Sequence, residues 1–429
     1  MTDYFPSFMK LEELCTFENG DRSENYPSGN DFVNEGIPFV NGGLIENGKV
    51  ILEGMNYITR EKYNSLRAGK AKCGDILWSI RGSFEKVALC PFEECAIASA
   101  LVIVRPKENI NPLYIYCMMN SPYFTKQCQN SNNGSVQANL SIDVARSFLI
   151  PWLPEESRDQ FVSTLTLIDS KIANNTAICS NLEAMSKLLY DYWFVQFDFP
   201  GENGKPYKSS GGKMVWNDEL KREIPAGWDV NTIGSIVSLE RGISYSTDDL
   251  MGDGIPMINL GSFTIGGGYK EGSLKSYSGS YLDDKKIFPY DLILCLTQQT
   301  SIDPSKDVIG CVMLVPDIFN SDVVISQDLT KIVCSDDMKF FLVQYFNAEY
   351  FHRYITGYAS GSNILHLDVN GVLRHFTCLP SKDILQKYSD MVKPMWKKRS
   401  ECMLQNQQLT SLRDFLLPML MNGQVKAGA

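Results

Sequence analysis

Amide and hydroxyl side chains gather in several polar stretches of this sequence, at residues 242–247, 298–300 and 360–363. These groups donate and accept hydrogen bonds, as the edges of DNA bases do in the grooves of a double helix. Loop solubility would explain each stretch taken singly, but the polar loops recur at equivalent places in the two halves of the chain. The candidate base-reading residues are Asn41, Ser244, Tyr245, Asn259, Gln298, Gln299, Ser362 and Asn363.

A basic run between positions 60 and 72 is a candidate for contacts with phosphate groups. Arg60, Lys62, Lys70 and Lys72 share this stretch with a single acid, Glu61. The formal net charge of the chain is −10, which argues against a nucleic-acid partner because phosphate contacts need Lys and Arg. Local charge decides such contacts more than the sum does, so the run predicts a phosphate-facing patch. A solvated surface face is the alternative for the same residues.

The sequence shows no motif for catalysis or for metal binding. All three histidines, His352, His366 and His375, lie in the second half, and they lack the spacing of metal ligands. The twelve cysteines form no Cys-x-x-Cys pair, and the glycines at 266–268 follow neither phosphate-loop nor dinucleotide-binding spacing. Residues 111–114 come close to an Asn-Pro-Pro-aromatic methyltransferase motif, but a helix start explains them better. We therefore predict no catalytic residue, no metal site and no bound cofactor.

Two long helices are predicted to position the polar loops. Apolar residues at alternating steps of four and three mark residues 155–197 and 381–426, as in a coiled coil. Asn175 occupies one position of the first seam, where a lone Asn commonly fixes the register of two helices. The remaining predicted seam residues are Leu165, Ile168, Ile172, Leu182 and Leu189 in the first helix, and Met395, Leu409, Leu412 and Leu416 in the second.

The chain contains an internal repeat of about 220 residues, since Gly36-Ile-Pro-Phe-Val-Asn41 returns as Gly254-Ile-Pro-Met-Ile-Asn259. Each copy combines a β-rich region with a long helix, so the second helix can lie antiparallel to the first and give the chain a pseudo-twofold axis. The predicted fold class is α+β. The predicted segments are a first β-rich domain at 1–154, a central helix at 155–197, a flexible linker at 198–226, a second β-rich domain at 227–380 and a C-terminal helix at 381–426.

Three motifs resemble the DNA-specificity subunits of type I restriction–modification systems. Residues 188–200 are similar to the signature at the end of that family's central spacer helix, and residues 412–425 to its C-terminal signature. Residues 225–228, with 242–246 and 254–259, resemble the opening of a target recognition domain. The resemblance implies a non-catalytic subunit in which two recognition domains, held apart by spacer helices, each read one half of a split DNA site.

The resemblance also implies partners. Two modification subunits, which carry the S-adenosylmethionine site, would dock around the spacer helices, and restriction subunits would join that core. Tyr192, Trp193 and Phe194 are candidates for the docking contact, although contact with the neighbouring recognition domain would explain them equally. The sequence shows no signal peptide and no membrane span, so a cytoplasmic location is expected. The alternative function is a structural scaffold that holds protein partners at the helix ends without binding DNA; a stand-alone methyltransferase or nuclease would need motifs that are missing.

Overall fold

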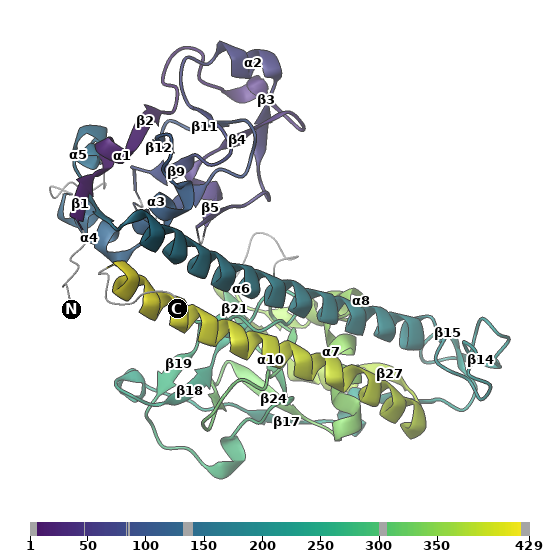
Figure 1. The fold of residues 1–429 in the computed structure, drawn as a ribbon. Helices are drawn as coiled ribbons and strands as arrows, with labels where there is room; N and C mark the ends of the chain where they lie inside the picture. Colours follow the sequence, from purple (N-terminus) through teal and green to yellow (C-terminus); the bar gives the residue numbers. More distant parts are fainter. Residues whose placement is uncertain are drawn as a thin grey trace. The chain divides into compact units, whose positions relative to one another are not determined.

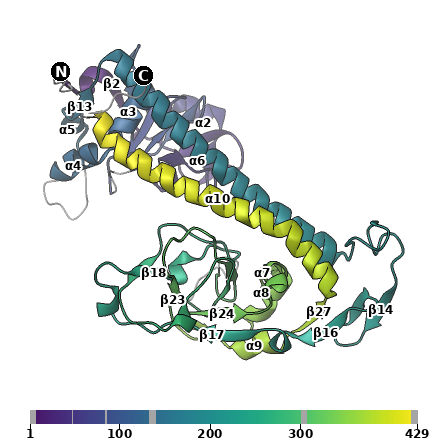
Figure 2. The same ribbon diagram turned by 60° about the horizontal axis from the view of Figure 1, so that its bottom comes forward.

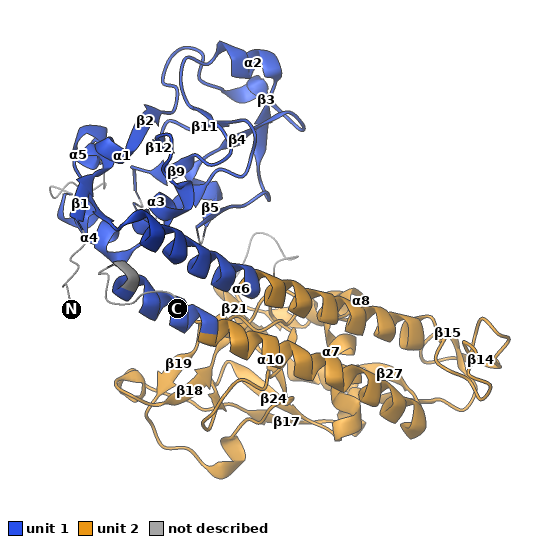
Figure 3. Cartoon of the chain, in the orientation of Figure 1, with its two compact units in different colours: residues 1–171, 409–429 blue, residues 172–408 orange. Residues whose placement is uncertain are grey.

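The computed structural model describes residues 7–46, 48–82, 84, 86–131, 140–299 and 307–421. The chain divides into two compact units, each with a β-rich region of its own (Figure 3). Unit 1 combines Met1–Lys171 with Leu409–Ala429, and unit 2 is Ile172–Gln408. Within the described ranges, no helix has the length and apolar character that crossing a membrane requires.

Unit 1 is built on a four-stranded antiparallel sheet with the order β10-β9-β12-β2 and a five-stranded sheet with the order β3-β7-β4-β11-β8. The central strand β9 is buried at every position, and three of its four residues are apolar. Its Trp78 packs edge-on against Phe124, with ring centroids 5.3 Å apart. The strands of this unit are β1 (Ser7–Lys10), β2 (Cys15–Asn19), β3 (Phe32–Val33), β4 (Ile37–Val40), β5 (Ile45–Glu46), β6 (Lys49–Val50), β7 (Asn56–Ile58), β8 (Lys70–Ala71), β9 (Ile76–Ser79), β10 (Val87–Leu89), β11 (Cys95–Ile97), β12 (Leu101–Pro106) and β13 (Leu149–Trp152), and its short helices are α1 (Leu11–Leu14), α2 (Arg60–Ser65), α3 (Pro112–Met119), α4 (Pro122–Asn130) and α5 (Ile142–Arg146).

Unit 2 repeats this plan, with a four-stranded sheet in the order β17-β24-β20-β22 and three-stranded sheets in the orders β19-β18-β23 and β21-β26-β25. Its strands are β14 (Met214–Asn217), β15 (Arg222–Pro225), β16 (Asp229–Thr232), β17 (Ser238–Arg241), β18 (Ile255–Ile258), β19 (Lys275–Tyr277), β20 (Leu292–Cys295), β21 (Thr297–Gln299), β22 (Val312–Leu314), β23 (Val324–Ile325), β24 (Leu329–Val333), β25 (Ala359–Ser360), β26 (Ile364–Leu367) and β27 (Phe376–Leu379), and its short helices are α7 (Lys339–Asn347), α8 (Glu349–Thr356) and α9 (Val369–Arg374).

The strand orders confirm the repeat read from the sequence. Strands β2, β9, β10 and β12 of unit 1 occupy the places that β17, β20, β22 and β24 occupy in unit 2. The pair β1–β13 likewise corresponds to β16–β27, and both pairs are antiparallel. Strand β1 therefore takes the place of β16, although the Pro-Ala-Gly-Trp sequence that precedes β16 has no counterpart before β1.

Two long helices, α6 (Glu155–Tyr190) and α10 (Lys382–Met421), run side by side in both ribbon views (Figures 1 and 2). Asp169 pairs with Arg413, Asn175 bonds with Gln405, and Glu183 pairs with Arg399. The partner numbers fall as the α6 numbers rise, so the helices are antiparallel. The α+β fold with two β-rich regions joined by packed long helices is thus confirmed.

The seam between the helices follows the prediction on α6, and on α10 it departs from the prediction at Leu412. Leu165, Ile168 and Asn175 are buried, and Asn175 is only 1% exposed; Ile172, Leu182 and Leu189 are half-buried. On α10, Met395, Leu409 and Leu416 are half-buried, whereas Leu412 is 45% exposed, which corrects the prediction for that residue. The side chains of α10 that bond with α6 include Arg399, Gln405, Asn406 and Arg413.

The segment between α6 and the second β-rich region is ordered, which corrects the expected flexible linker at 198–226. One π-helical turn, Asp191–Val195, ends the helix. Strands β14 and β15 then form an antiparallel pair, and Phe199 stacks on Trp228 with ring centroids 5.0 Å apart. The polar, glycine-rich composition of the segment concealed this hairpin, because its apolar contacts come from a few aromatic residues.

Candidate nucleic-acid interface

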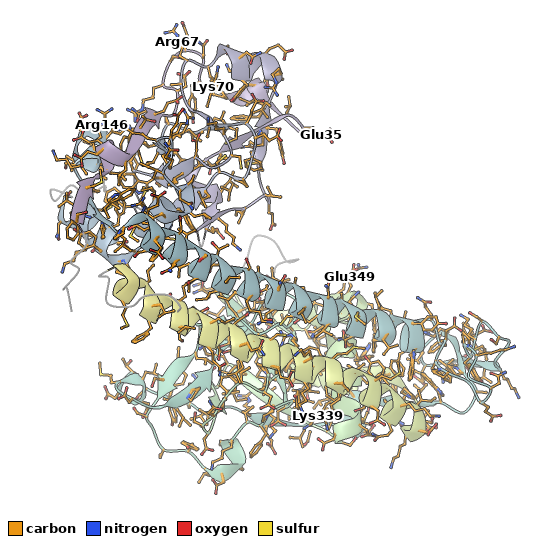
Figure 4. All side chains as sticks on the ribbon, viewed as in Figure 1. Glu35, Arg67, Lys70, Arg146, Lys339 and Glu349 are labelled. Carbon is orange, nitrogen blue, oxygen red and sulfur yellow. The ribbon has the colours of Figure 1, made fainter. Side chains whose placement is uncertain are left out.

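Unit 1 has a cavity of about 530 Å³ where β2, the end of β9 and the start of α5 meet. Its floor is apolar, because Ile80 and Leu140 are buried there. Polar and charged side chains line the rest of the cavity and are exposed: Asn19, Arg22, Arg81, Ser141, Asp143 and Arg146. Arg146 is the last residue of α5 and lies apart from Lys70 of the predicted basic run (Figure 4).

Unit 2 has a cavity of about 490 Å³ at the corresponding place, after β17 and β20. Leu296 and Leu367 supply its apolar floor. The Ser244 hydroxyl donates to Gln327 Oε1 over 2.7 Å, and the Thr297 hydroxyl donates to Asp328 over 3.2 Å. The cavity lining also contains Arg241 and His366.

The two cavities are equivalent in the repeat, as their backbone contacts show. The Leu140 N–H donates to the Ile80 carbonyl over 3.0 Å in unit 1, and the Leu367 N–H donates to the Leu296 carbonyl over 2.9 Å in unit 2. A glycine at the end of the first sheet strand approaches the opposite backbone in both units: a methyl group on Gly20 would collide with the Ala98 carbonyl, and one on Gly242 with the Ser326 carbonyl. Each unit therefore presents a polar hollow on a rigid apolar base.

The repeated asparagines Asn41 and Asn259 hold the backbone. Each side-chain oxygen accepts the N–H of the residue two positions on, Gly43 or Gly261, at 2.8 Å. Asn259 is 8% exposed, and its amide also donates to the Ser273 carbonyl. Asn259 is therefore committed to turn structure, which corrects its assignment as a base-reading residue. Asn41 is half-buried and caps the equivalent turn.

The neighbouring glutamines Gln298 and Gln299 face opposite ways. Gln298 is 8% exposed, donates to Asp307 and accepts the backbone N–H groups of Val308 and Ile309. It is a structural residue, and its assignment to base contacts is corrected. Gln299 is exposed and pairs in register with Ile364, next to the exposed Ser362 and Asn363. These three polar residues therefore meet at one end of the β21-β26-β25 sheet, while Thr300 lies outside the described residues.

The two remaining candidates of unit 2 lie in the segment after β17. Ser244 is exposed and lines the cavity of that unit. The Tyr245 hydroxyl is engaged by the Lys275 ammonium, which also lies 4.7 Å from the centre of the Tyr245 ring.

The predicted basic run is partly neutralised within unit 1. Arg60 pairs with Glu94 at 2.6 Å, and Lys62 pairs with Asp31 at 3.0 Å. The Ser28 N–H and the Lys62 ammonium hold the pKa of Asp31 below its ordinary value, so this carboxylate stays charged beside Lys62.

The other two lysines of the run differ in their surroundings. The Lys70 ammonium donates to a backbone carbonyl and lies over the Tyr63 ring. Lys72 is exposed and has no ion pair with a described residue. Lys72 is therefore the member of the run most available to a phosphate group.

Two of the three aromatic residues proposed for subunit docking are buried. Trp193 is 3% exposed and Phe194 is 7% exposed. The Phe194 ring lies 4.8 Å from Tyr388 and 4.9 Å from Phe341, within the core of unit 2. Neither side chain presents a surface to a partner, so their docking assignment is corrected. Tyr192 is 39% exposed and remains available.

Sequence reasoning missed the charged and amide side chains at the two cavities, namely Arg22, Arg81, Arg146, Arg241 and Gln327. Each stands singly in the sequence and forms no cluster there. A signal was nevertheless present in the repeat. The sequence Asp75-Ile-Leu-Trp of the first copy aligns with Asp291-Leu-Ile-Leu of the second. This alignment makes Arg81 the equivalent of Thr297, which lines the cavity of unit 2.

The comparisons with known proteins agree on one family. A family model described as the type I restriction modification DNA specificity domain matches residues 7–184. The chain is 23% identical to the type I restriction enzyme MjaIX specificity subunit of Methanocaldococcus jannaschii, over 86% of this chain and 83% of that protein. It is 22% identical to the HindI specificity subunit of Haemophilus influenzae, over 97% of this chain and 100% of that protein.

A solved structure shares the fold. It is that of the S subunit of a type I restriction–modification system from M. genitalium, with a TM-score of 0.59 at 12% identity, over 98% of this chain and 97% of that one. This likeness concerns the fold alone. Taken together, the family model over residues 7–184 and the two curated relatives support a DNA specificity subunit of a type I restriction–modification system, a class of subunit that is non-catalytic.

Proposed function

We propose that the two β-rich regions each read one part of a bipartite double-stranded DNA target. The equivalent cavities carry this proposal, because the same strand ends build a polar hollow in both units while the side chains around the hollow differ. A repeated scaffold with unlike linings suits the reading of two unlike half-sites. Gln299, Ser362 and Asn363 at the end of the β21-β26-β25 sheet would extend the reading surface of unit 2.

The proposed partners are two modification subunits, which would bring S-adenosylmethionine, and restriction subunits that join this core. A stripe of exposed apolar side chains on α6 and the turn after it supports the docking of a protein. The stripe residues, which we call the docking stripe, are Ile178, Met185, Leu188, Tyr192 and Val195. They recur at steps of seven, three, four and three, which places them on one helix face away from α10. An exposed apolar patch of this kind commonly marks a protein contact.

The test of the function is to produce the chain with its proposed modification subunit and to sequence the methylated adenines in the host DNA. We expect one bipartite motif with two specified halves and a fixed gap, and no methyl transfer by either chain alone. Methylation at unrelated sequences, or a motif with a single uninterrupted half, would contradict the proposal. Methyl transfer by the purified specificity chain would contradict the non-catalytic assignment.

A further inference from the structure

Three arginines surround the unit 1 cavity in a chain whose net charge is −10. Arg22, Arg81 and Arg146 stand against one acid, Asp143, in the cavity lining. The cavity is therefore locally positive although the whole chain is acidic. Such a concentration of charge favours an anionic or strongly hydrogen-bond-accepting partner.

Most arginines of unit 1 are already neutralised by carboxylates. Arg60, Arg67, Arg105 and Arg413 each pair with an acid within 4 Å. Arg158 has no carboxylate but covers the Trp152 ring at 4.0 Å and donates to a backbone carbonyl. The arginines of this unit outside the cavity thus find partners within the protein.

The three cavity arginines differ in how free their guanidinium groups are. Arg146 pairs with Asp143 at 3.2 Å, and Arg22 donates to the Ser99 carbonyl at 3.3 Å. Both keep some donors for a ligand. No hydrogen bond or ion pair joins the Arg81 side chain to any other residue in the described parts of the chain. As far as the described residues go, Arg81 therefore keeps all of its side-chain N–H donors for a ligand in the cavity that it lines.

The backbone beneath Arg81 is held on both sides. Ile80, the preceding residue, is 4% exposed and its carbonyl accepts the Leu140 N–H. The Ser79 hydroxyl donates to the Arg81 carbonyl over 3.0 Å. A reading side chain needs such a fixed backbone, because the point from which it reaches a base then stays constant.

We propose that Arg81 specifies a guanine in the half-site read by unit 1, while Arg22 and Arg146 hold the neighbouring phosphates. The arginine fork matches the O6 and N7 acceptors that guanine presents in the major groove, which is the commonest specific contact between arginine and DNA. The two partly engaged arginines suit phosphates, where a point charge is sufficient. This inference rests on the proposed function and specifies which base the reading site of unit 1 recognises.

The first experiment uses the wild-type complex with its modification subunit and a duplex containing the motif found by methylation sequencing. Each guanine of the duplex is replaced in turn by 7-deazaguanine, which lacks the N7 acceptor but still pairs with cytosine. We expect one position, in one half-site only, at which binding weakens by about tenfold. If no guanine in either half-site shows such a loss, the inference is wrong.

The second experiment assigns that guanine to Arg81. Arg81→Lys keeps the charge but loses the two-pronged fork, so it should relax the motif at that position while leaving the salt dependence of binding unchanged. Replacing the same guanine by 7-deazaguanine should then cause no further loss. Arg67→Ala, an exposed unit 1 arginine outside the cavity, is the matched control and should leave the motif as it was. Arg22→Ala and Arg146→Ala should each weaken binding to all sequences and lower the salt slope by about one.

The results separate this inference from the proposed function. A wild-type complex that methylates no bipartite motif overturns both. A wild-type complex with a bipartite motif that Arg81→Lys leaves fully specified overturns the role of Arg81 alone. Gln327→Ala, in the equivalent cavity of unit 2, should affect only the other half-site. If Arg81→Lys and Gln327→Ala altered the same half-site, the assignment of Arg81 to a separate reading site would be wrong.

Discussion

Gln298 and Gln299 show at the scale of the residue how two identical side chains take different roles. The amide of Gln298 closes the turn at Asp307–Ile309 from inside the protein, whereas Gln299 is exposed at the end of β21. The sequence indicates only that both amides can hydrogen-bond. Whether a backbone or a base is the partner depends on which side of the strand each one faces, and the register of β21 with β26 decides that.

We expect Gln298→Ala to destabilise unit 2 by about 2 kcal/mol, because two backbone N–H groups lose their acceptor. We expect Gln298→Ala to leave the DNA sequence preference of the folded protein unchanged. Gln299→Ala is the matched neighbour and should leave the unfolding midpoint unchanged. Denaturant unfolding of both variants makes the comparison. Equal stability of the two variants would place Gln298 among the surface residues instead.

The basic run gives a second prediction at this scale. Lys72→Ala should lower the salt slope of DNA binding by about one, since Lys72 carries an unneutralised charge. Lys62→Ala should change it less, because the Lys62 charge already serves Asp31. Binding measured over a range of salt concentrations tests both variants. An unchanged salt slope for Lys72→Ala would mean that the basic run is a solvated surface face without phosphate contacts.

The long helices show at the scale of the element what heptad reading can and cannot predict. The steps of four and three correctly predicted two long helices and the buried place of Asn175. They failed at one predicted position of α10, since Leu412 is 45% exposed, and they missed the buried Arg399, which pairs with Glu183 of α6. A pattern based on apolar residues cannot select an arginine as a seam residue. The first turns of α10 also pack into the core of unit 2 through Leu385 and Tyr388, so more than one helix face is buried.

The stability of the helix pair depends on the ion pair between the buried Arg399 and Glu183. Glu183→Ala should destabilise the pair by about 1–3 kcal/mol, less than for a fully buried pair because the Glu183 side chain is 43% exposed. The loss arises mainly because a guanidinium that is 7% exposed is left uncompensated. The double variant Glu183→Leu with Arg399→Leu should recover much of the loss, as measured by thermal unfolding. A double variant less stable than Glu183→Ala would contradict this account.

The docking stripe on α6 supplies the second prediction for an element. Leu188→Glu should prevent assembly with the modification subunit, because it places a charge on a side chain that is 67% exposed and apolar. Ala173→Glu, at an exposed helix position outside the stripe, is the control and should assemble normally. Size-exclusion chromatography of the mixed chains measures assembly, and circular dichroism checks that both variants remain folded. Normal assembly of Leu188→Glu would remove the stripe from the interface.

The internal repeat is the main feature at the scale of the whole molecule. It could be predicted from the sequence because the matching motifs lie at the ends of equivalent strands. The cavities could not be predicted in the same way, since residues far apart in sequence, such as Arg22 and Arg146, meet only in the fold. Unlike linings on a common scaffold leave no shared motif to find. The sequence therefore indicates where reading occurs more readily than which residues read.

We expect the long helices to determine the gap between the two half-sites. The units divide α6 after Lys171 and α10 after Gln408, at positions that face each other in the antiparallel pair. Inserting seven residues at both places preserves the seam and adds about 10 Å of helix, which corresponds to at most ~3 base pairs. Sequencing the methylated sites should show unchanged half-sites with a longer gap. Insertion of two residues at each place rotates the seam and should damage folding instead. Altered half-sites after the seven-residue insertion would show that helix length does not set the gap.

The discontinuity of unit 1 has a consequence for protein synthesis. Leu416 and Leu417 pack against the core that contains Phe161 and Leu165, yet more than two hundred residues of unit 2 separate the two segments. On the ribosome, the first β-rich region emerges early and its last apolar contacts emerge late. Unit 1 is thus completed after unit 2 has been translated, the reverse of the usual order in which N-terminal domains finish first. The nascent chain must keep the uncovered face of α6 from aggregating until α10 arrives.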